Sequence, residues 1–411
     1  MNIVILYDSL MKNILVFTST FPKFTPWDAT PGFVYELSRR LVDQELRINI
    51  LTPRVPGSKK YEEINGLKIY RYPYFFREKF EKLNDGAILP NLKANKWLYF
   101  QVPFLLFFWF IYLIKIIKKE KIDIIHAHWI IPQWLIAILI KKILFPHIQV
   151  IITSHGSDIF WLRWSIMNFL KKFTLQWARS ITVVSTSIKD KILWLWIDEK
   201  KVFVIPMGTD ITNFNPSKYE EGLKQKYDIT WIFLLFVWRL TEVKWLIYLI
   251  QAIPKILIRH PSLKLLIVGD WPQRKELEKL VNSLWIEKSI IFVGAINHEK
   301  LPHYFATADV FIWPSIHASD GTEEWFWLTF VESILSGTKT IWTKIQWIMD
   351  IIEEWKTGFL VIEKDSDALA DKILEVIDDT AFDMQKARNI IENKFSWDII
   401  GEKYRKILLR I

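Results

Sequence analysis

Residues 11–20 read MKNILVFTST, a short apolar run that ends in hydroxyl-bearing residues. A run of this length with polar residues after it is typical of a buried β-strand. The next stretch, 33–42, has the amphipathic spacing of a helix, and apolar runs then alternate with helical stretches to the end of the chain. This alternation predicts an α/β protein with mainly parallel sheets covered by helices on both faces.

The same alternation occurs twice along the chain. In the first half we expect helices at 33–42, 102–119, 134–143 and 166–177, a hairpin within 61–72, an irregular surface segment over 71–96, and strands at 47–52, 122–126, 149–153, 180–184 and 202–205. Residues 206–222 lack periodicity, as a linker does. Strands are then expected at 233–237, 263–268, 290–293, 310–312, 339–342 and 358–361.

Two successive halves of this kind predict two Rossmann-like, doubly wound domains. We place the first at 1–205 and the second at 206–390, with 391–411 as a closing helix that crosses back to the first domain. Residues 1–10 are expected to be dispensable, because Met11 is an alternative start immediately before the first strand. The pattern alone leaves other paired Rossmann-like architectures open.

Composition limits the classes of protein to be considered. The 411 residues are 51% apolar, enough for a large core, and the absence of cysteine fits a reducing cytoplasm. Residues 1–205 carry 29 Lys and Arg against 16 Asp and Glu, a net +13, whereas the remainder carries −4. A basic half indicates an anionic partner, either nucleic acid or an anionic membrane surface. Surface lysines kept for solubility are the alternative.

The longest apolar run is 102–114, followed by four lysines within 115–121. A membrane-spanning helix needs about 20 apolar residues, so this run does not predict one. Two interpretations remain: a buried helix of an α/β domain, or a helix that dips into a membrane interface.

Tryptophan is abundant and glycine is scarce, with 22 and 13 residues. Ordinary usage would give roughly 29 glycines in a chain of this length. Many of the tryptophans stand where strand-to-helix turns should lie, and such turns commonly need glycine. We therefore hypothesise that UGA codons are read as glycine in the source organism at about 18 of these positions. Trp129 and Trp397 are expected to be genuine, the identities of Trp97 and Trp109 stay open, and a truly Trp-rich protein is the alternative.

The most informative motif is residues 323–333, EEWFWLTFVES. With glycine at 325 and 327 it resembles the Glu-x7-Glu motif of family 4 retaining glycosyltransferases. A loop of backbone amides that leads into a helix N-terminus is a ready anion site. The resemblance implies that Glu332 accepts the ribose hydroxyls of a nucleotide-sugar donor and that Glu324 lies at its sugar end. The donor-binding residues that it implies include Gly294, Trp325, Phe326, Trp327, Leu328 and Thr329.

Two further segments are similar to the same family. Residues 237–245, VWRLTEVKW, place Arg239 and Lys244 where they would neutralise the donor diphosphate. Residues 153–158, TSHGSD, resemble the family's H-G-x-D element, which implies that His155 contacts the donor sugar near the transferred carbon. The loop 19–33 resembles the acceptor loop, with Trp27 and Gly32 at its glycine positions.

The resemblance covers residues 12–411 and implies a GT-B enzyme, with its two domains facing a central cleft. The implied reaction is retaining, metal-independent transfer of a hexose-type sugar from a UDP- or GDP-linked donor to a glycan or lipid-linked acceptor, as in cell-surface polysaccharide synthesis. His126 and His128 invite a metal site, but no further ligand stands at suitable spacing.

The implied location is cytoplasmic and peripheral at the inner membrane face, with no cofactor and no nucleic acid partner. A GT-B nucleotide-sugar epimerase and a catalytically inactive nucleotide-sugar-binding module are the alternatives. As written, Trp325 and Trp327 would fill the donor site, so the literal sequence is expected to be inactive.

Overall fold

The computed structural model describes residues 11–23, 32–85, 88–160, 164–237, 244–269, 274–314, 328–345 and 350–410. Contacts within the chain divide it into two compact units. The first unit ends at Gly208 and resumes at Trp397, and the second runs Thr209–Ser396. The chain therefore passes twice between the units.

The first unit is built on a sheet with the strand order β3-β4-β2-β1-β5-β6-β7-β8. Its strands are β1 (Lys12–Phe17), β2 (Leu46–Pro53), β3 (Tyr61–Ile64), β4 (Leu67–Tyr72), β5 (Ile124–His128), β6 (Gln149–Ser154), β7 (Ser180–Val183) and β8 (Val202–Val204). All pairings are parallel except that of β3 with β4, which is the expected hairpin. The central strand β5 is buried along its whole length, as expected for a parallel strand covered on both faces.

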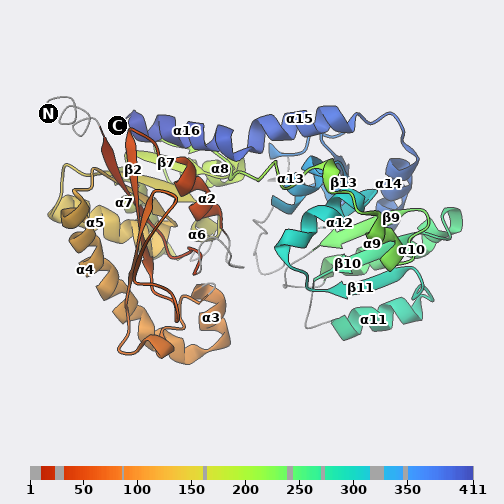
Figure 1. The fold of residues 1–411 in the computed structure, drawn as a ribbon, viewed down its shortest axis with the longest axis horizontal. Helices are drawn as coiled ribbons and strands as arrows, with labels where there is room; N and C mark the ends of the chain where they lie inside the picture. Colours follow the sequence, from red (N-terminus) through yellow and green to blue (C-terminus); the bar gives the residue numbers. More distant parts are fainter. Residues whose placement is uncertain are drawn as a thin grey trace. The chain divides into compact units, whose positions relative to one another are not determined.

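Helices cover this sheet (Figure 1). They are α2 (Phe33–Arg40), α3 (Ile88–Ala94), α4 (Val102–Glu120), α5 (Leu135–Ile143), α6 (Ser157–Phe160), α7 (Ser165–Trp177), α8 (Thr186–Trp194) and α16 (Trp397–Leu409). The helix α4 contacts β2, β4 and α5, α5 in turn contacts α7, and α16 packs against α2. The segment expected to be irregular over 71–96 instead contains the end of β4 and the helix α3.

The second unit has the strand order β11-β10-β9-β12-β13-β14, with every pairing parallel. The strands are β9 (Phe233–Val237), β10 (Lys264–Val268), β11 (Ile290–Gly294), β12 (Val310–Trp313), β13 (Lys339–Thr343) and β14 (Phe359–Val361). Its helices are α9 (Glu221–Lys226), α10 (Lys244–Arg259), α11 (Arg274–Ser283), α12 (Leu301–Thr307), α13 (Leu328–Leu335), α14 (Ser366–Asp378) and α15 (Met384–Phe395). Residues of α10, α11 and α14 form one core with the sheet. Both units are thus doubly wound and Rossmann-like, as the sequence predicts.

The closing helix expected over 391–411 is two helices instead. The helix α15 ends at Phe395, and Ser396 adopts an extended conformation before α16 begins. Ser396 pairs with Thr209, so the two passages between the units lie side by side. Trp397 opens α16, is buried, and packs its ring against Gly208, where a Cβ would come within 2.5 Å of it. A packed indole ring is what we expect at a position where tryptophan is the genuine residue.

The tryptophans suspected of replacing glycine differ in conformation and in burial. Trp196, Trp285 and Trp355 have left-handed φ angles between 57° and 64°, which are unusual for a bulky residue. Trp164, Trp177, Trp194 and Trp231 are exposed. In contrast, Trp134, Trp313 and Trp342 are fully buried, as is Trp109, whose identity the sequence leaves open. Trp129, which is expected to be genuine, also has a positive φ, of 67°, with a ψ of 132°. Trp238, Trp325 and Trp327 lie outside the described residues.

The clearest of these left-handed positions is Trp285, at the end of α11. Its N–H donates to the carbonyl of Asn282, and the next N–H, that of Ile286, donates to the carbonyl of Val281. These two bonds define a Schellman motif, in which the left-handed position is usually glycine. The Trp285 side chain is 87% exposed, so it gains little by burial.

Trp285→Gly should raise the free energy of unfolding by about 1 kcal/mol, because glycine adopts a left-handed φ without a Cβ clash. Urea denaturation of the two proteins measures the difference. The matched control is Trp164→Gly. Trp164 is also exposed, but its φ is −69°, in the region that ordinary residues adopt. Equal effects at both positions would contradict this account of Trp285.

Candidate functional site

The first candidate site lies where strands β1, β5 and β6 end. Strand order reverses between β1 and β5, because β2 and β4 extend the sheet on one side of β1 and β5 begins the other side. Ligands of open parallel sheets bind outside the carboxyl ends of the strands at such a switch point. His126 and His128 come from the end of β5, and His155 follows β6. The sequence motif therefore lies at the edge where a ligand is expected.

The three histidines form one cluster. His128 and His155 are joined by a hydrogen bond of 2.9 Å between Nδ1 and Nε2, and their rings stack. The rings of His126 and His128 lie 4.5 Å apart. His155 also contacts the rings of Phe33 and Trp129, at 4.8 and 4.7 Å. The expected sugar-contacting residue is thus held by aromatic and imidazole rings rather than standing alone at a strand end.

A chain of hydroxyl groups pairs with His126. The Thr182 hydroxyl lies 3.2 Å from the carbonyl of Ile152 and 2.6 Å from the Thr153 hydroxyl, which in turn lies 2.7 Å from Nε2 of His126. When Thr182 donates to the carbonyl, Thr153 donates to Thr182 and accepts from His126, whose proton is then on Nε2. Tyr404 of α16 lies beside this chain, with its hydroxyl 3.5 Å from that of Thr153, and burial raises its pKa to about 12.

Burial keeps the histidine cluster neutral. Desolvation lowers the pKa of His126 and of His155 to about 3. It lowers the pKa of His128 well below the ordinary value, with the neighbouring imidazoles adding to the effect. These side chains can donate and accept hydrogen bonds near neutral pH, but they bring no positive charge to a ligand.

Asp158 organises the loop that carries His155. One carboxylate oxygen accepts from the Ser154 hydroxyl at 2.7 Å and from the backbone N–H of Gly156 at 3.1 Å. The other oxygen accepts from the N–H of Ile130 at 2.9 Å. Burial raises the pKa of Asp158, and these bonds oppose that rise. Gly156 has a φ of 99°, which a side chain would strain, so Asp158 and Gly156 together define the path of the backbone next to His155.

The acceptor-side residues are only partly described. Gly32 caps the N-terminus of α2 with a φ of −80°, next to Phe33, which contacts His155. Its backbone conformation does not itself require glycine. Trp27 lies outside the described residues.

The second candidate site lies at the corresponding edge of the other sheet. Here the strand order reverses between β9 and β12, so the switch point is where these two strands end. The helix α13 follows β12 in the chain and carries Leu328, Thr329 and Glu332. Gly294 ends β11 with a φ of 82°, and space is open where its side chain would be. The structure brings these expected donor residues to one edge of one sheet.

Glu332 is a buried carboxylate with an unfilled position. Its Oε1 lies 3.6 Å from Nε2 of His298, which is largely exposed. Its Oε2 is buried and has no hydrogen-bond partner among the residues that the structure describes. Buried polar atoms are nearly always paired, so this oxygen can accept from a donor group of a ligand. The same state occurs at other buried atoms of the described residues, such as Asn49 Oδ1 and Gln133 Oε1.

The remaining expected residues of this site are not placed. Arg239, Glu324, Trp325, Phe326 and Trp327 lie outside the described residues. Lys244 is the first residue of α10, but its side chain is also outside them.

Sequence reasoning missed three residues of these sites: Phe33, His298 and Tyr404. Phe33 adjoins Gly32, which belongs to the expected acceptor loop, so the sequence did offer a signal for Phe33. Tyr404 lies 251 residues from the threonine that it approaches, and no local pattern reveals such a contact. His298 stands in the short 3₁₀ helix His298–Lys300 after β11, a segment without a distinctive motif.

Two family models match the chain. The model described as Glycosyltransferase Family 4 matches residues 32–213, and the one described as Glycosyl transferases group 1 matches residues 222–397. The first match covers the histidine cluster, and the second covers Gly294 and Glu332.

Curated relatives match along most of the chain. An uncharacterized glycosyltransferase of Methanocaldococcus jannaschii is 26% identical over 84% of this chain and 85% of its own length. The N-acetyl-alpha-D-glucosaminyl L-malate synthase of Bacillus anthracis is also 26% identical, over 71% of this chain and 76% of its own length. The gpi3 subunit of the phosphatidylinositol N-acetylglucosaminyltransferase of Schizosaccharomyces pombe is 23% identical, over 91% of this chain and 76% of its own length.

Solved structures share the fold. The sucrose-phosphate synthase of Thermosynechococcus elongatus superposes with a TM-score of 0.72 at 20% identity, covering 97% of this chain and all of its own. The Anabaena protein HepE, solved in complex with UDP, gives a TM-score of 0.71 at 16% identity over 98% of this chain and all of its own. These neighbours have the GT-B fold.

The buried histidines predict how stability depends on pH. Their pKa values are lowered in the folded state, so below about pH 6.5 the unfolded chain binds protons that the folded chain does not. Stability present above that pH is therefore lost as the pH falls toward 3. From pH 6.5 to 5, the free energy of unfolding should fall by about 2 kcal/mol for His126 alone.

Urea denaturation followed by circular dichroism across this pH range measures the fall. His126→Gln should reduce the slope, whereas His147→Gln, at an exposed position outside the cluster, should leave it unchanged. The same slope in all three proteins would contradict a neutral buried cluster.

Proposed function

Since this chain belongs to the family 4 glycosyltransferases of the GT-B type, we propose that it transfers a hexose-type sugar from a nucleotide-sugar donor to a glycan or lipid-linked acceptor, with retention of anomeric configuration. The observation that carries the donor half of this proposal is the buried oxygen of Glu332 that no described residue binds, at the switch point of the second sheet. A ribose with two adjacent hydroxyl groups supplies the donors that this oxygen lacks.

The rest of the donor fits the same edge of the sheet. The open space beside Gly294 allows a ligand to approach the backbone closely. Arg239 and Lys244 are the proposed partners of the diphosphate, where their charges would stabilise the negative charge that grows on the leaving group. Glu324 is the proposed partner of the sugar. A diphosphate held by two cations needs no metal ion to leave, so we propose metal-independent transfer without a further cofactor.

His155 is the proposed contact to the transferred sugar. Because its pKa is lowered, it is neutral near pH 7 and would act by hydrogen bonding rather than as an acid. The proposed chemistry is attack of the acceptor hydroxyl on the same face from which the diphosphate departs. The hydroxyl proton then passes to a phosphate oxygen, the bond from the sugar carbon to the diphosphate breaks, and the new glycosidic bond forms.

Two comparisons favour particular donors as first tests. The names of two relatives refer to an N-acetylglucosaminyl group, and the Anabaena neighbour was solved with UDP. UDP-linked sugars should therefore be tested first and GDP-linked sugars second. We propose that the enzyme works in the cytoplasm, peripherally at the inner membrane face, in the synthesis of a cell-surface glycan.

We also propose that UGA is read as glycine in the source organism, which would open the donor site at positions 325 and 327. The left-handed φ angles of Trp196, Trp285 and Trp355 support this proposal. The four fully buried tryptophans give it no such support.

Peptide mass spectrometry of the protein from its source cells should find glycine at positions 196, 285 and 355, and also at 325 and 327. Trp397 serves as the internal control and should be found as tryptophan, because its packed ring needs no replacement. Tryptophan at all of these positions would end the recoding proposal.

Glu332→Gln should weaken UDP binding by roughly ten- to a hundredfold, because a charge-assisted hydrogen bond is worth about 1.5–3 kcal/mol. Calorimetry should use the chain with glycine at 238, 325 and 327, with and without this substitution. Glu276→Gln, on the exposed side of α11, is the control and should bind UDP normally.

Unchanged UDP and GDP affinity in the Glu332 variant would remove this residue from the donor site.

Incubation with UDP-sugars alone tests the epimerase alternative, because an epimerase converts its nucleotide sugar without any acceptor. The anomeric configuration of a transferred sugar, read by NMR, tests retention.

A further inference from the structure

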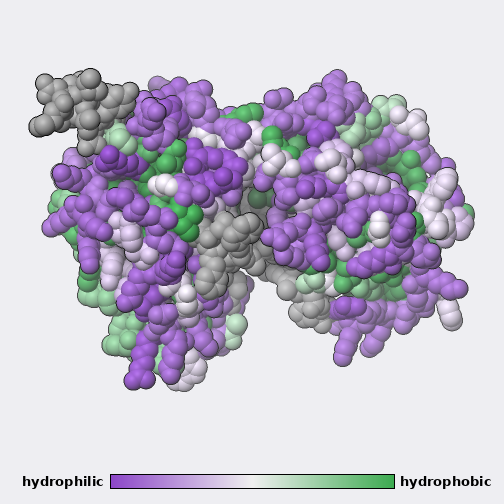
Figure 2. Space-filling model, viewed as in Figure 1, coloured by the Kyte–Doolittle hydropathy of each residue, from purple (hydrophilic) through white to green (hydrophobic). Residues whose placement is uncertain are grey.

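The first unit carries a group of exposed aromatic side chains that the proposed chemistry does not use. They lie within residues 76–111, on the loop after β4, on the 3₁₀ helix Lys96–Gln101 and on α4. We call this group, together with one aliphatic neighbour, the aromatic surface; it consists of Phe76, Phe80, Trp97, Tyr99, Phe100, Phe107 and Phe110, with Ile111. Trp97 is 87% exposed and Phe76 80%. Figure 2 shows hydrophobic side chains at the surface where α3 and α4 lie in Figure 1. Gathered apolar residues of this kind mark an interaction surface.

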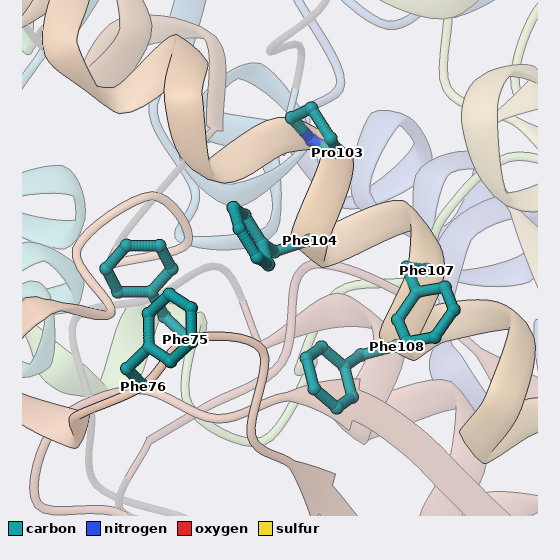
Figure 3. Close-up of a pocket in the computed structure, with 6 residues that line it drawn as sticks. All are labelled: Phe75, Phe76, Pro103, Phe104, Phe107 and Phe108. Atoms are coloured by element: carbon teal, nitrogen blue, oxygen red, sulfur yellow. The ribbon is translucent and has the colours of Figure 1, made fainter.

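A groove of about 350 Å³ opens within the aromatic surface. Phe75 and Phe76 approach from the loop after β4, and their ring centroids each lie 5.4 Å from that of Phe104 on α4 (Figure 3). Pro103, Phe107 and Phe108 complete the lining. The lining is made almost entirely of carbon, so the groove suits a hydrocarbon chain and offers little to a polar ligand.

The helix α4 is fixed to the sheet along one face. Leu105, Trp109 and Leu113 repeat at every fourth position and are buried, and Trp109 packs against Phe17 of β1. The segment Lys96–Glu120 is long and apolar enough to cross a membrane, but only by length and composition. A helix held to a sheet in this way can offer its outer face to a membrane interface, as an interfacial helix does. The buried-helix interpretation of this run is confirmed for the face that packs on the sheet, and the membrane-interface interpretation concerns the outer face.

Positive charge surrounds the aromatic surface. Residues 75–121 contain nine Lys and Arg against four Asp and Glu. Two of those acids are already engaged: Glu81 is buried in an ion pair with Arg54, and Glu120 binds Lys68. The exposed cations nearest in sequence to the aromatic residues are Arg77, Lys79, Lys82, Lys93 and Lys96. Such cations next to apolar side chains match the phosphate groups and acyl chains of an anionic lipid surface.

We propose that the aromatic surface docks the protein onto an anionic lipid bilayer. The exposed rings enter the boundary between head groups and acyl chains, the cations lie at the phosphates, and the groove receives part of an acyl chain. Charge favours this partner over a second copy of the chain, because two such surfaces would bring like charges together. The inference rests on the proposed peripheral location at the membrane and names the surface that makes the contact. Lipid binding needs neither donor nor acceptor, so it can be tested separately from the proposed transfer reaction.

Vesicle sedimentation of the full chain tests this proposal. The vesicles contain phosphatidylcholine and phosphatidylglycerol in equal parts, with pure phosphatidylcholine for comparison. The double variant Phe76→Ser and Phe107→Ser should bind the mixed vesicles roughly tenfold more weakly or worse, since two exposed rings lose their apolar contact. The matched control is Ile166→Ser with Phe169→Ser on α7, two similarly exposed apolar residues of the same unit, and should bind normally.

The charge half of the proposal has its own test. Lys79→Gln with Lys96→Gln should weaken binding to the mixed vesicles by roughly thirtyfold, because each of the two cations near an anionic surface is worth about 1 kcal/mol, and added salt should reduce the difference. Thermal unfolding of each variant checks that the fold is intact.

Equal vesicle binding by all four proteins would overturn the proposal. So would dimers of the unsubstituted chain that the aromatic double variant loses, as seen by light scattering, because the surface would then join two copies.

Discussion

Parallel strand pairing is the constraint on which the rest of this structure depends. Every described strand pair is parallel except that of β3 with β4, so each pair needs a crossover on one face of the sheet and the carboxyl ends collect along one edge. In both sheets the chain extends first to one side and then to the other, which leaves a switch point beside the starting strand. The histidine cluster and Glu332 each stand at such a point, although their residues are far apart in the sequence.

Burial leaves polar atoms without described partners at both switch points. In the first unit the histidines are neutral, and the Thr153 hydroxyl pairs with Nε2 of His126, but Nδ1 of His126 and Nε2 of His128 have no partner among the described residues. In the second unit it leaves Glu332 with an oxygen that lacks a partner among the described residues. Rings and hydroxyl groups suit a neutral sugar, whereas an unfilled carboxylate oxygen suits a hydroxyl donor. Each edge therefore has the polarity of one part of a nucleotide sugar.

How much of this could be predicted from the sequence depended on whether the signal was local. The apolar run that forms β9 gives its bounds without error, at Phe233–Val237, because a buried parallel strand is nearly continuous in apolar residues. The helix α3 was missed, since its residues stand in a stretch of mixed aromatic and charged residues without clear periodicity. The break at Ser396 was missed because the pairing with Thr209 that extends this residue is a long-range contact. At the candidate sites, the motifs located His155 and Glu332, but not the partners that come from distant segments.

The tryptophans show where local reasoning reaches its limit. Trp285 stands at a left-handed helix end whose hydrogen bonds would form equally well with glycine, and its ring adds almost no burial. The φ of Trp129 is also positive, yet its ring lies against the rings of Phe33 and His155, so its side chain does contribute contacts. Backbone conformation alone therefore does not separate a misplaced ring from a useful one. The contacts of the side chain decide the matter. Replacing Trp129 by glycine would remove an indole that contacts the histidine cluster, whereas replacing Trp285 by glycine would remove only backbone strain.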